Sequence, residues 1–174
     1  MRRVRYVVAM SLDGYIAGPN GEADWIIMDP DIDFHGLFDQ FDTFLLGRRT
    51  FESMARAGGG AQQGVRTIVF SRTLRQQNYP KVTIVSGEPE QALADLRSKP
   101  GKDIWLFGGG SLFRSLLEAR LVDTVEVSVI PVLLGDGIPL LPTKPSSEWL
   151  KLASSRAFET GIVSLAYAVE YEPA

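Results

Sequence analysis

The segment IWLFGGGSLF, residues 104–113, constrains the fold more than any other part of this sequence. Its four leading residues favour a buried strand, which runs directly into Gly108, Gly109 and Gly110, and a helical pattern follows at once. A strand that turns immediately into a helix is the repeating unit of a parallel sheet. Free N–H groups at the start of a helix bind anions, and glycines let the backbone approach a phosphate closely. We therefore expect a phosphate site at these three glycines and the start of the helix that follows; a glycine-rich turn without a ligand is the alternative.

Two other strand ends carry cations. The run LLGRRTFES again reads as strand, glycine and helix, and Arg48 and Arg49 stand where the helix begins. Cations at a helix N-terminus oppose the macrodipole, so a bound anion would explain them; solvated surface arginines are the alternative. The run TIVFSR ends a third strand at Ser71 and Arg72. No acidic residue follows these three strands, and arginines accommodate a 2′-phosphate, so the pattern favours NADP over NAD.

Strands and helices alternate along the first two thirds of the chain. Near-continuous apolar runs predict strands at 4–12, 43–46, 65–70, 82–85 and 104–107. The first of these is expected to be buried on both faces, as in a parallel sheet. Helical spacing predicts helices at 48–57, 88–98 and 111–119. Residues 13–24 are expected to form a loop. The overall pattern predicts an α/β fold with a mainly parallel sheet.

A further helix is predicted to begin at Asp29 and Pro30, because an N-cap residue followed by proline is a common helix start. Its apolar stripe would consist of Phe34, Leu37, Phe38 and Phe41.

Asp31 would lie in the first turn of that helix, on the face of Phe34. A carboxyl among aromatic rings is partly desolvated, which raises its pKa and suits it to protonating a substrate nitrogen. We therefore name Asp31 as the candidate catalytic acid, with Asp29 and Asp33 as competitors. A first-turn Asp that only stabilises the helix dipole is the alternative reading.

After residue 120 the pattern becomes that of antiparallel strands, expected at 124–132, 150–157 and 163–171. These segments are rich in Val, Ile, Leu and Tyr. Late antiparallel strands tend to lie at a sheet edge, and an exposed apolar edge must be covered or paired. We therefore expect a homodimer.

Composition narrows the function classes. The chain has 174 residues, which suits one domain over residues 1–174, and a formal net charge of −3, which is unfavourable for nonspecific binding to nucleic acid. It has no cysteine and one histidine, so thiolate zinc sites, cysteine nucleophiles and multi-histidine metal sites are excluded. No apolar run reaches the ~20 residues that cross a bilayer. We expect a cytoplasmic protein without a metal or a membrane partner.

Taken together, five segments resemble the dihydrofolate-reductase-like superfamily, and within it the branch of the riboflavin-biosynthesis reductase, the C-terminal domain of the bifunctional deaminase–reductase. In chain order the segments are VAMSLDGYIAGPNG with DW, FLLGRRTFESM, TIVFSR, IWLFGGGSLFRSLL and VIPVLLGDGIPLLP. The resemblance implies a three-layer α/β/α sandwich around a mixed eight-stranded sheet with antiparallel C-terminal strands. It also implies NADPH as the cofactor, and pairing of two copies through the C-terminal strands.

The resemblance also implies roles for individual residues. Those that would contact the nicotinamide are Ala9, Ile16 and Ala17. Those that would hold the pyrophosphate and the 2′-phosphate are Gly47, Arg48, Arg49, Thr50 and the segment Gly108 to Leu112. Those that would flank the adenosine are Ser71 and Arg72.

Two departures from the family's pattern leave the substrate open. Dihydrofolate reductases have a Pro-Trp pair with an acidic residue five positions after Trp, whereas here Asp24 precedes Trp25 and Pro30 stands five positions on. The riboflavin-type reductases have an Asp-Asn-Pro segment where this chain has ESMARAGGGAQQGVRT. We expect an NADPH-dependent reductase of the dihydrofolate reductase or 5-amino-6-(5-phosphoribosylamino)uracil reductase type that acts on a small heterocyclic compound. An NADP-binding module of this fold without catalysis is the alternative.

Overall fold

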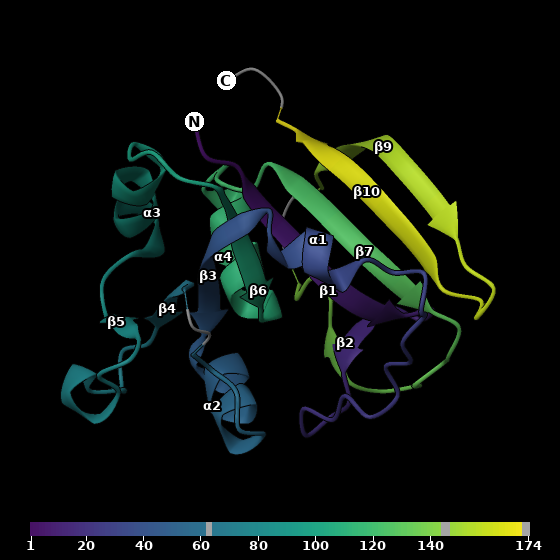
Figure 1. The fold of residues 1–174 in the computed structure, drawn as a ribbon, viewed down its shortest axis with the longest axis horizontal. Coiled ribbons are helices and arrows are strands. Elements are labelled where there is room, and N and C mark those ends of the chain that lie inside the picture. The colour runs from purple at the N-terminus through teal and green to yellow at the C-terminus, as the bar shows by residue number, and fades with distance from the viewer. Residues whose placement is uncertain (62–63, 144–146, 172–174) are drawn as a thin grey trace.

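The computed structural model describes residues 1–61, 64–143 and 147–171. Its main sheet has eight strands in the order β5-β4-β3-β6-β1-β7-β10-β9 (Figure 1). The strands are β1 (Val4–Ser11), β3 (Phe41–Gly47), β4 (Arg66–Phe70), β5 (Thr83–Val85), β6 (Asp103–Gly108), β7 (Thr124–Ile130), β9 (Trp149–Ala157) and β10 (Val163–Glu170).

The first strand lies in the middle of this sheet, parallel to both neighbours. Val4 pairs with Ile104 of β6, and Tyr6 pairs with Val125 of β7. Only β10 and β9 run antiparallel, β10 beside β7 and β9 at the edge. The prediction of a parallel α/β sheet with an antiparallel C-terminal part is therefore confirmed. Strand β7, expected among the antiparallel strands, runs parallel to β1 and antiparallel only to β10.

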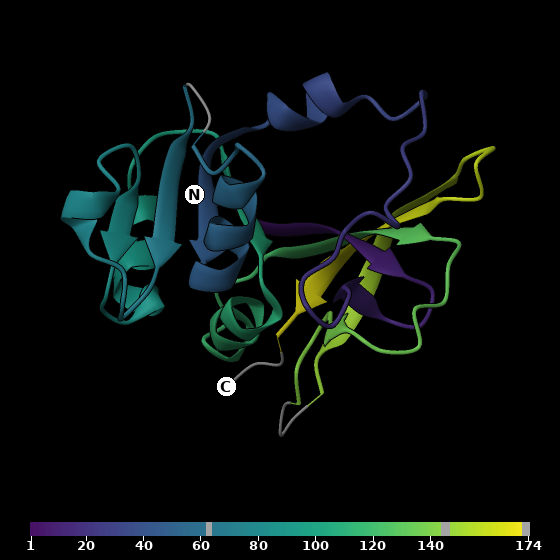
Figure 2. The same ribbon diagram turned by 90° about the horizontal axis from the view of Figure 1, so that it is seen from below.

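Helices cover both faces of the parallel strands, which gives three layers. On one face lie α3 (Pro89–Arg97) and α4 (Gly110–Glu118), whose leucines pack with Val4, Leu45 and Ile104. On the other face lie α1 (Phe34–Phe38) and α2 (Arg48–Arg56), which pack against an aromatic cluster around Trp105. The short helix η1 (Gln76–Asn78) follows β4. Figure 2 shows the strands β7, β10 and β9 extending beyond the helices. Among the described residues, no helix is long and apolar enough to span a membrane.

Three local predictions are wrong. The segment 13–24, expected as a loop, contains the short strand β2 (Tyr15–Ala17), which pairs with β8 (Ile138–Pro139). Helix α1 begins at Phe34 rather than after Asp29, and the N-cap is Asp33, whose carboxylate accepts from the N–H of Gly36 at 2.8 Å. Phe41, expected on the helical stripe, begins β3. Pairing with distant strands decides β2 and β3, whereas a local cap decides the start of α1.

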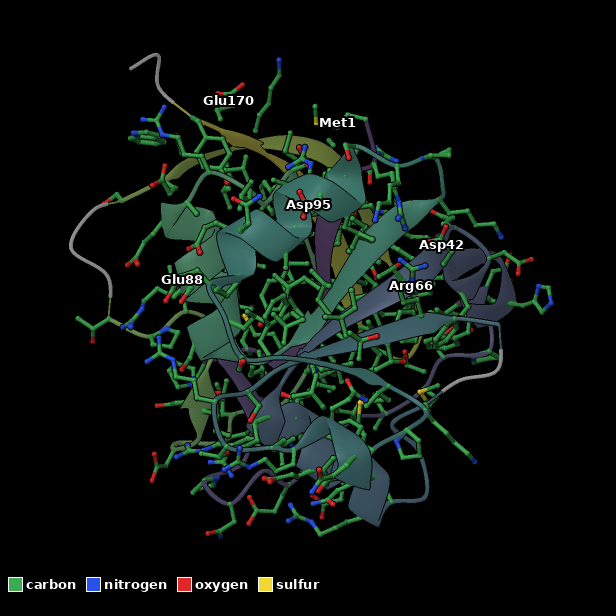
Figure 3. The ribbon with its side chains drawn as sticks, turned by 90° about the vertical axis from the view of Figure 1, so that its left-hand side faces the viewer. Met1, Asp42, Arg66, Glu88, Asp95 and Glu170 are labelled. Carbon is green, nitrogen blue, oxygen red and sulfur yellow. The ribbon has the colours of Figure 1, made fainter. Side chains whose placement is uncertain are left out.

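Ion pairs hold the arginines at the N-terminus. Arg2 pairs with Asp42, and Arg5 makes a bidentate pair at 2.7 Å with Glu126 of the neighbouring strand. Both guanidinium groups are largely buried, and a buried charge requires such a partner. These pairs lie at the amino ends of the strands. In Figure 3, Asp42 and Arg66 mark that end, and Glu88 lies at the opposite one.

Two tyrosines differ in how their hydroxyl groups are accommodated. Tyr6 is fully buried, its ring stacks on Phe113 with centroids 4.0 Å apart, and its hydroxyl has no partner within the described part of the chain. Burial raises the pKa of Tyr6. The hydroxyl of Tyr171 donates to the carbonyl of Val122 at 2.8 Å and accepts from the same residue's N–H at 3.2 Å. Burial raises the pKa of Tyr171 to about 12.

We expect opposite effects when these two hydroxyl groups are removed. Tyr6→Phe should raise the free energy of unfolding by about 1 kcal/mol, because a buried hydroxyl without a partner is removed. Tyr171→Phe should lower it by about 1 kcal/mol, because two hydrogen bonds are lost. Urea unfolding of both variants measures the difference. A less stable Tyr6→Phe variant would show that its hydroxyl has a partner in solution.

Candidate functional site

The candidate site lies at the carboxyl ends of the parallel strands. Strands β4, β3 and β6 are neighbours in that order and end at Phe70, Gly47 and Gly108. In open α/β sheets, ligands bind at this edge. The glycines and the arginines predicted from three separate segments are therefore brought to one edge.

The turns after β3 and β6 lie close together, with glycines on both sides of the contact. A Cβ on Gly47 would lie 3.6 Å from the backbone N of Gly109. A Cβ on Gly108 or Gly109 would lie 3.4 Å or 3.2 Å from the hydroxyl of Thr50. The peptide bond between these two glycines is cis. The two turns form a cradle of bare backbone, which we call the glycine cradle (Gly47, Thr50, Gly108 and Gly109).

Two helices begin at this cradle. Helix α2 has Gly47 as its N-cap and α4 has Gly109, and neither end has a side-chain cap from the described residues. The first N–H groups of a helix have no partner within the helix, so they are available to an anion. In α4 these groups belong to Gly110, Ser111 and Leu112, and of these Ser111 is exposed. The geometry fits a pyrophosphate.

Gly110 has a different role. A Cβ there would lie 2.9 Å from the carbonyl oxygen of Pro139 and 3.0 Å from the ring of Pro142. This glycine lets α4 pack against the segment that follows β8. The third glycine of the run is thus required by the fold, whereas the first two form the cradle.

The three arginines are exposed at the start of α2 and after β4. Arg48 pairs with Glu52 one turn further along α2 at 3.1 Å. Arg72 approaches Glu88 at 3.5 Å. No partner of Arg49 is found among the described residues. Such surface pairs contribute little energy, so all three side chains are free to turn toward a phosphate.

Ser71 shapes a turn. It is buried, and its hydroxyl oxygen accepts from the N–H groups of Thr73 at 3.2 Å and Leu74 at 3.0 Å. This arrangement fixes the backbone that carries Arg72.

The residues expected beside a nicotinamide lie on two strands. Ala9 belongs to β1, and Ile16 and Ala17 belong to β2; all three are half-buried. Asp13 positions β2, since its carboxylate accepts from Ser11 Oγ at 2.6 Å and from the backbone of residues 134–135. The Ser11 hydroxyl and those N–H groups lower the pKa of Asp13.

The placement of Asp31 in a first helical turn is wrong. It lies in the loop before α1, and its side chain is exposed, so the expected desolvation by aromatic rings is not found. Of its two competitors, Asp33 caps α1 and Asp29 is buried. Among the described residues, Asp31 is the one of the three whose carboxylate accepts no hydrogen bond.

Asp29 joins two distant parts of the chain. Its carboxylate accepts from the Thr160 hydroxyl at 2.7 Å and from the N–H of Asp31 at 2.9 Å. These bonds, that from Thr160 foremost, lower the pKa of Asp29. Thr160 lies in the turn between β9 and β10, so the bond fixes the 18–33 loop beside the carboxyl ends of β1 and β7. Sequence reasoning missed Thr160, because nothing local links residues 131 positions apart.

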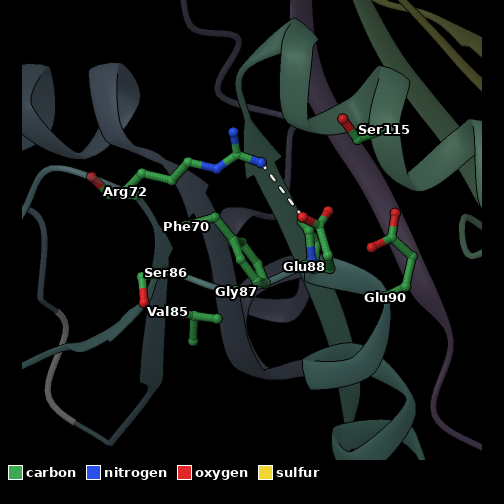
Figure 4. Close-up of a pocket in the computed structure, with 10 residues that line it drawn as sticks. Phe70, Arg72, Val85, Ser86, Gly87, Glu88, Glu90 and Ser115 are labelled. Atoms are coloured by element: carbon green, nitrogen blue, oxygen red, sulfur yellow. Dashed lines mark hydrogen bonds and ion pairs between the residues drawn. The ribbon is translucent and has the colours of Figure 1, made fainter.

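A pocket of about 220 Å³ opens beyond β4 and β5, and its lining includes Phe70, Arg72, Glu88, Glu90 and Ser115 (Figure 4). The sequence pattern suggested that no acidic residue reaches this edge. That holds for the three strands it considered, but two glutamates follow the fourth strand, β5, and share the pocket with Arg72. The end of β5 at Val85 was predicted correctly, but the comparison of strand ends covered only the strands followed by glycines or arginines.

The sheet order and helical layers define a dihydrofolate-reductase-like fold. The dihydrofolate reductase of Enterococcus faecalis, solved in complex with NADP(H), superposes with a TM-score of 0.73 at 20% identity over 97% of each chain. This likeness concerns the fold.

The chain belongs to the RibD C-terminal domain family, whose model matches residues 2–164. It is 35% identical over 178 residues to the uncharacterized protein YyaP of Bacillus subtilis (strain 168), covering 95% of this chain and 94% of the relative. A crystal structure from Shewanella sp. PV-4, described as a "Putative riboflavin biosynthesis protein", has a TM-score of 0.84 at 27% identity, covering 98% of this chain and 100% of that one. The resemblance seen in the sequence, to the branch of the riboflavin-biosynthesis protein RibD, is confirmed.

The bond between Thr160 and Asp29 should depend on pH. Because the folded-state pKa of Asp29 is below its ordinary value of 3.8, its carboxylate stabilises the fold above that pH, and the contribution is lost as the pH falls through the lowered pKa. Thr160→Val should therefore lower the urea midpoint at pH 7, and the deficit should shrink below pH 3.8. Thr83→Val, at the exposed first residue of β5, is the control. A deficit that is constant with pH would contradict this account.

Proposed function

We propose that this chain is an NADPH-dependent reductase of a small heterocyclic compound. The observation that carries the proposal is the glycine cradle between two uncapped helix N-termini, with three exposed arginines at the same edge. Membership of a reductase family and the fold shared with a dihydrofolate reductase support it.

In this proposal each part of the edge binds one part of the dinucleotide. The backbone of the glycine cradle and the first turn of α4 hold the pyrophosphate. Arg48, Arg49 and Arg72 attract the phosphates, and Ser71 fixes the turn that presents Arg72 to the adenosine. Ala9, Ile16 and Ala17 pack against the nicotinamide. The bound cofactor would supply a hydride.

The substrate of the proposed reaction would be of the dihydrofolate or 5-amino-6-(5-phosphoribosylamino)uracil type. Asp31 would supply a proton to it, because Asp29 and Asp33 already accept hydrogen bonds within the fold. The exposure of Asp31 favours a second candidate, a module that binds NADP without catalysis. A cytoplasmic location is part of the proposal, in keeping with a chain free of cysteine.

The discriminating experiment follows NADPH oxidation with a panel of pterins and aminopyrimidines, beside NADPH binding by fluorescence. Oxidation that depends on one panel member supports the reductase. Binding without oxidation across the panel supports the binding module, and the absence of binding contradicts both.

Gly109→Ala should weaken NADPH binding at least tenfold with a small effect on stability, because its Cβ points into the cradle and meets only the Thr50 hydroxyl. Gly110→Ala is the matched control, since its Cβ meets the Pro139 carbonyl and should lower the melting temperature. Thermal melts and fluorescence titration separate the two effects. Unchanged NADPH affinity in a folded Gly109→Ala variant would place the pyrophosphate elsewhere.

Asp31→Asn should lower turnover on the substrate that the panel identifies, while NADPH affinity stays near that of the wild type. Asp33→Asn is the control, because asparagine also caps helices and the same charge is removed nearby. Full turnover in Asp31→Asn would exclude this carboxylate as the proton donor.

A homodimer is the second part of the proposal. Every residue of β9 is exposed, and Trp149 at 74% and Leu152 at 53% exposure lie on the open edge of the sheet. An uncovered apolar edge favours pairing with a second copy.

Light scattering at micromolar concentration should therefore give twice the chain mass of 19.2 kDa. Leu152→Lys, which places a charge on the edge strand, should reduce the mass to that of one chain. A wild-type mass of one chain would refute the dimer.

A further inference from the structure

The pocket beyond β4 and β5 combines charges of both signs. Its lining includes one cation, Arg72, and two carboxylates, Glu88 and Glu90, so the charged side chains at its wall sum to −1. Ser86 and Ser115 add hydroxyl groups, and the ring of Phe70 forms an apolar wall. In Figure 4, Arg72 reaches from the end of β4 toward Glu88 across Phe70, while Glu90 and Ser115 lie on the helical side.

The pocket adjoins the glycine cradle through α4. Ser115 lies one turn beyond Ser111, and its hydroxyl donates to the Ser111 carbonyl at 3.1 Å. A dinucleotide whose pyrophosphate rests on the start of α4 therefore has this pocket within reach of its adenosine ribose.

The ion pair at the pocket is weak. The side chains of Arg72 and Glu88 are 82% and 74% exposed, and their closest atoms are 3.5 Å apart. An exposed pair of this kind contributes little, so Arg72 can leave Glu88 for a phosphate. Because Glu88 lies 3.5 Å from Arg72, well within the screening length of ~8 Å in physiological salt, a phosphate bound by Arg72 would be repelled by this carboxylate.

NADH and NADPH are distinguished by the charge of the side chains near the 2′-position of the adenosine ribose. A carboxylate accepts a hydrogen bond from the 2′-hydroxyl of NADH, whereas an arginine accommodates the 2′-phosphate of NADPH. This pocket has both kinds of side chain. The arginine would favour binding of NADPH. The glutamates would repel the 2′-phosphate of NADPH but could accept a hydrogen bond from the 2′-hydroxyl of NADH.

We propose that Glu88, assisted by Glu90, sets the dinucleotide choice of this chain by opposing the 2′-phosphate that Arg72 attracts. The two dinucleotides then bind with affinities within about tenfold of each other, with NADPH the preferred one. The inference rests on the proposed function, since it concerns the adenosine end of the same cofactor.

The test is a calorimetric titration of the full chain with NADPH and with NADH, for the wild type and three variants. Glu88→Gln should raise the affinity for NADPH about three- to tenfold and leave that for NADH equal or lower, because a like charge is removed beside the phosphate. Arg72→Gln should weaken the binding of NADPH more than the binding of NADH. Glu170→Gln removes the same charge at the far end of β10 and should leave the ratio unchanged.

Two further measurements locate the effect. Adenosine 2′,5′-bisphosphate and adenosine 5′-monophosphate should show the same change in ratio as the full dinucleotides, because they contain the adenosine end alone. The gain in Glu88→Gln should also diminish as salt is raised, since exposed charges are screened.

The outcomes separate the two proposals. Failure of both dinucleotides to bind the wild type would overturn the proposed function and this inference with it. Binding of both, with a wild-type preference for NADPH well above tenfold or with an unchanged ratio in Glu88→Gln, would overturn the inference alone.

Discussion

The arrangement of the site depends on one steric constraint, the contact between the turns that follow β3 and β6. The two turns are in contact: a Cβ on Gly47 would lie 3.6 Å from the backbone N of Gly109, and a Cβ on Gly109 would lie 3.2 Å from the Thr50 hydroxyl. This approach brings the N-termini of α2 and α4 together, with the Thr50 hydroxyl between the glycines. Each helix end has unpaired N–H groups, and together they give an anion more donors than either could alone.

Around this contact, the parallel sheet separates two kinds of charge. At the amino ends of the strands, arginines are paired with carboxylates and partly buried, which joins β1 to its neighbours. At the carboxyl ends, Arg48, Arg49 and Arg72 are exposed and paired weakly. Arginine side chains thus stabilise the fold at one edge of the sheet, whereas other arginines are available to a ligand at the opposite edge.

The sequence predicts those parts of the structure that local patterns determine. Buried apolar runs gave the parallel strands to within a few residues, and the glycines after β3 and β6 indicated the cradle. The missed features depend on partners distant in sequence. Strand β2 exists because of β8, and the burial of Asp29 depends on the β9–β10 turn. The pair Asp29–Pro30 was taken as the start of α1, whereas Asp33 caps that helix and Asp29 instead accepts from Thr160. Glu88 was predicted to begin a helix, but its place beside Arg72 depends on the pairing of β5 with β4, which no local pattern indicates.

The central place of β1 has a consequence for synthesis of the chain. Its neighbours, β6 and β7, begin about a hundred residues later, at Asp103 and Thr124. While the ribosome makes the intervening residues, one of the most apolar segments of the protein has no native strand beside it. Pairing over such a separation closes a long loop and is slow. The arginines at positions 2, 3 and 5 place positive charge at the start of this unpaired segment. Repulsion between these charges helps to prevent aggregation of nascent chains until β6 has been synthesised.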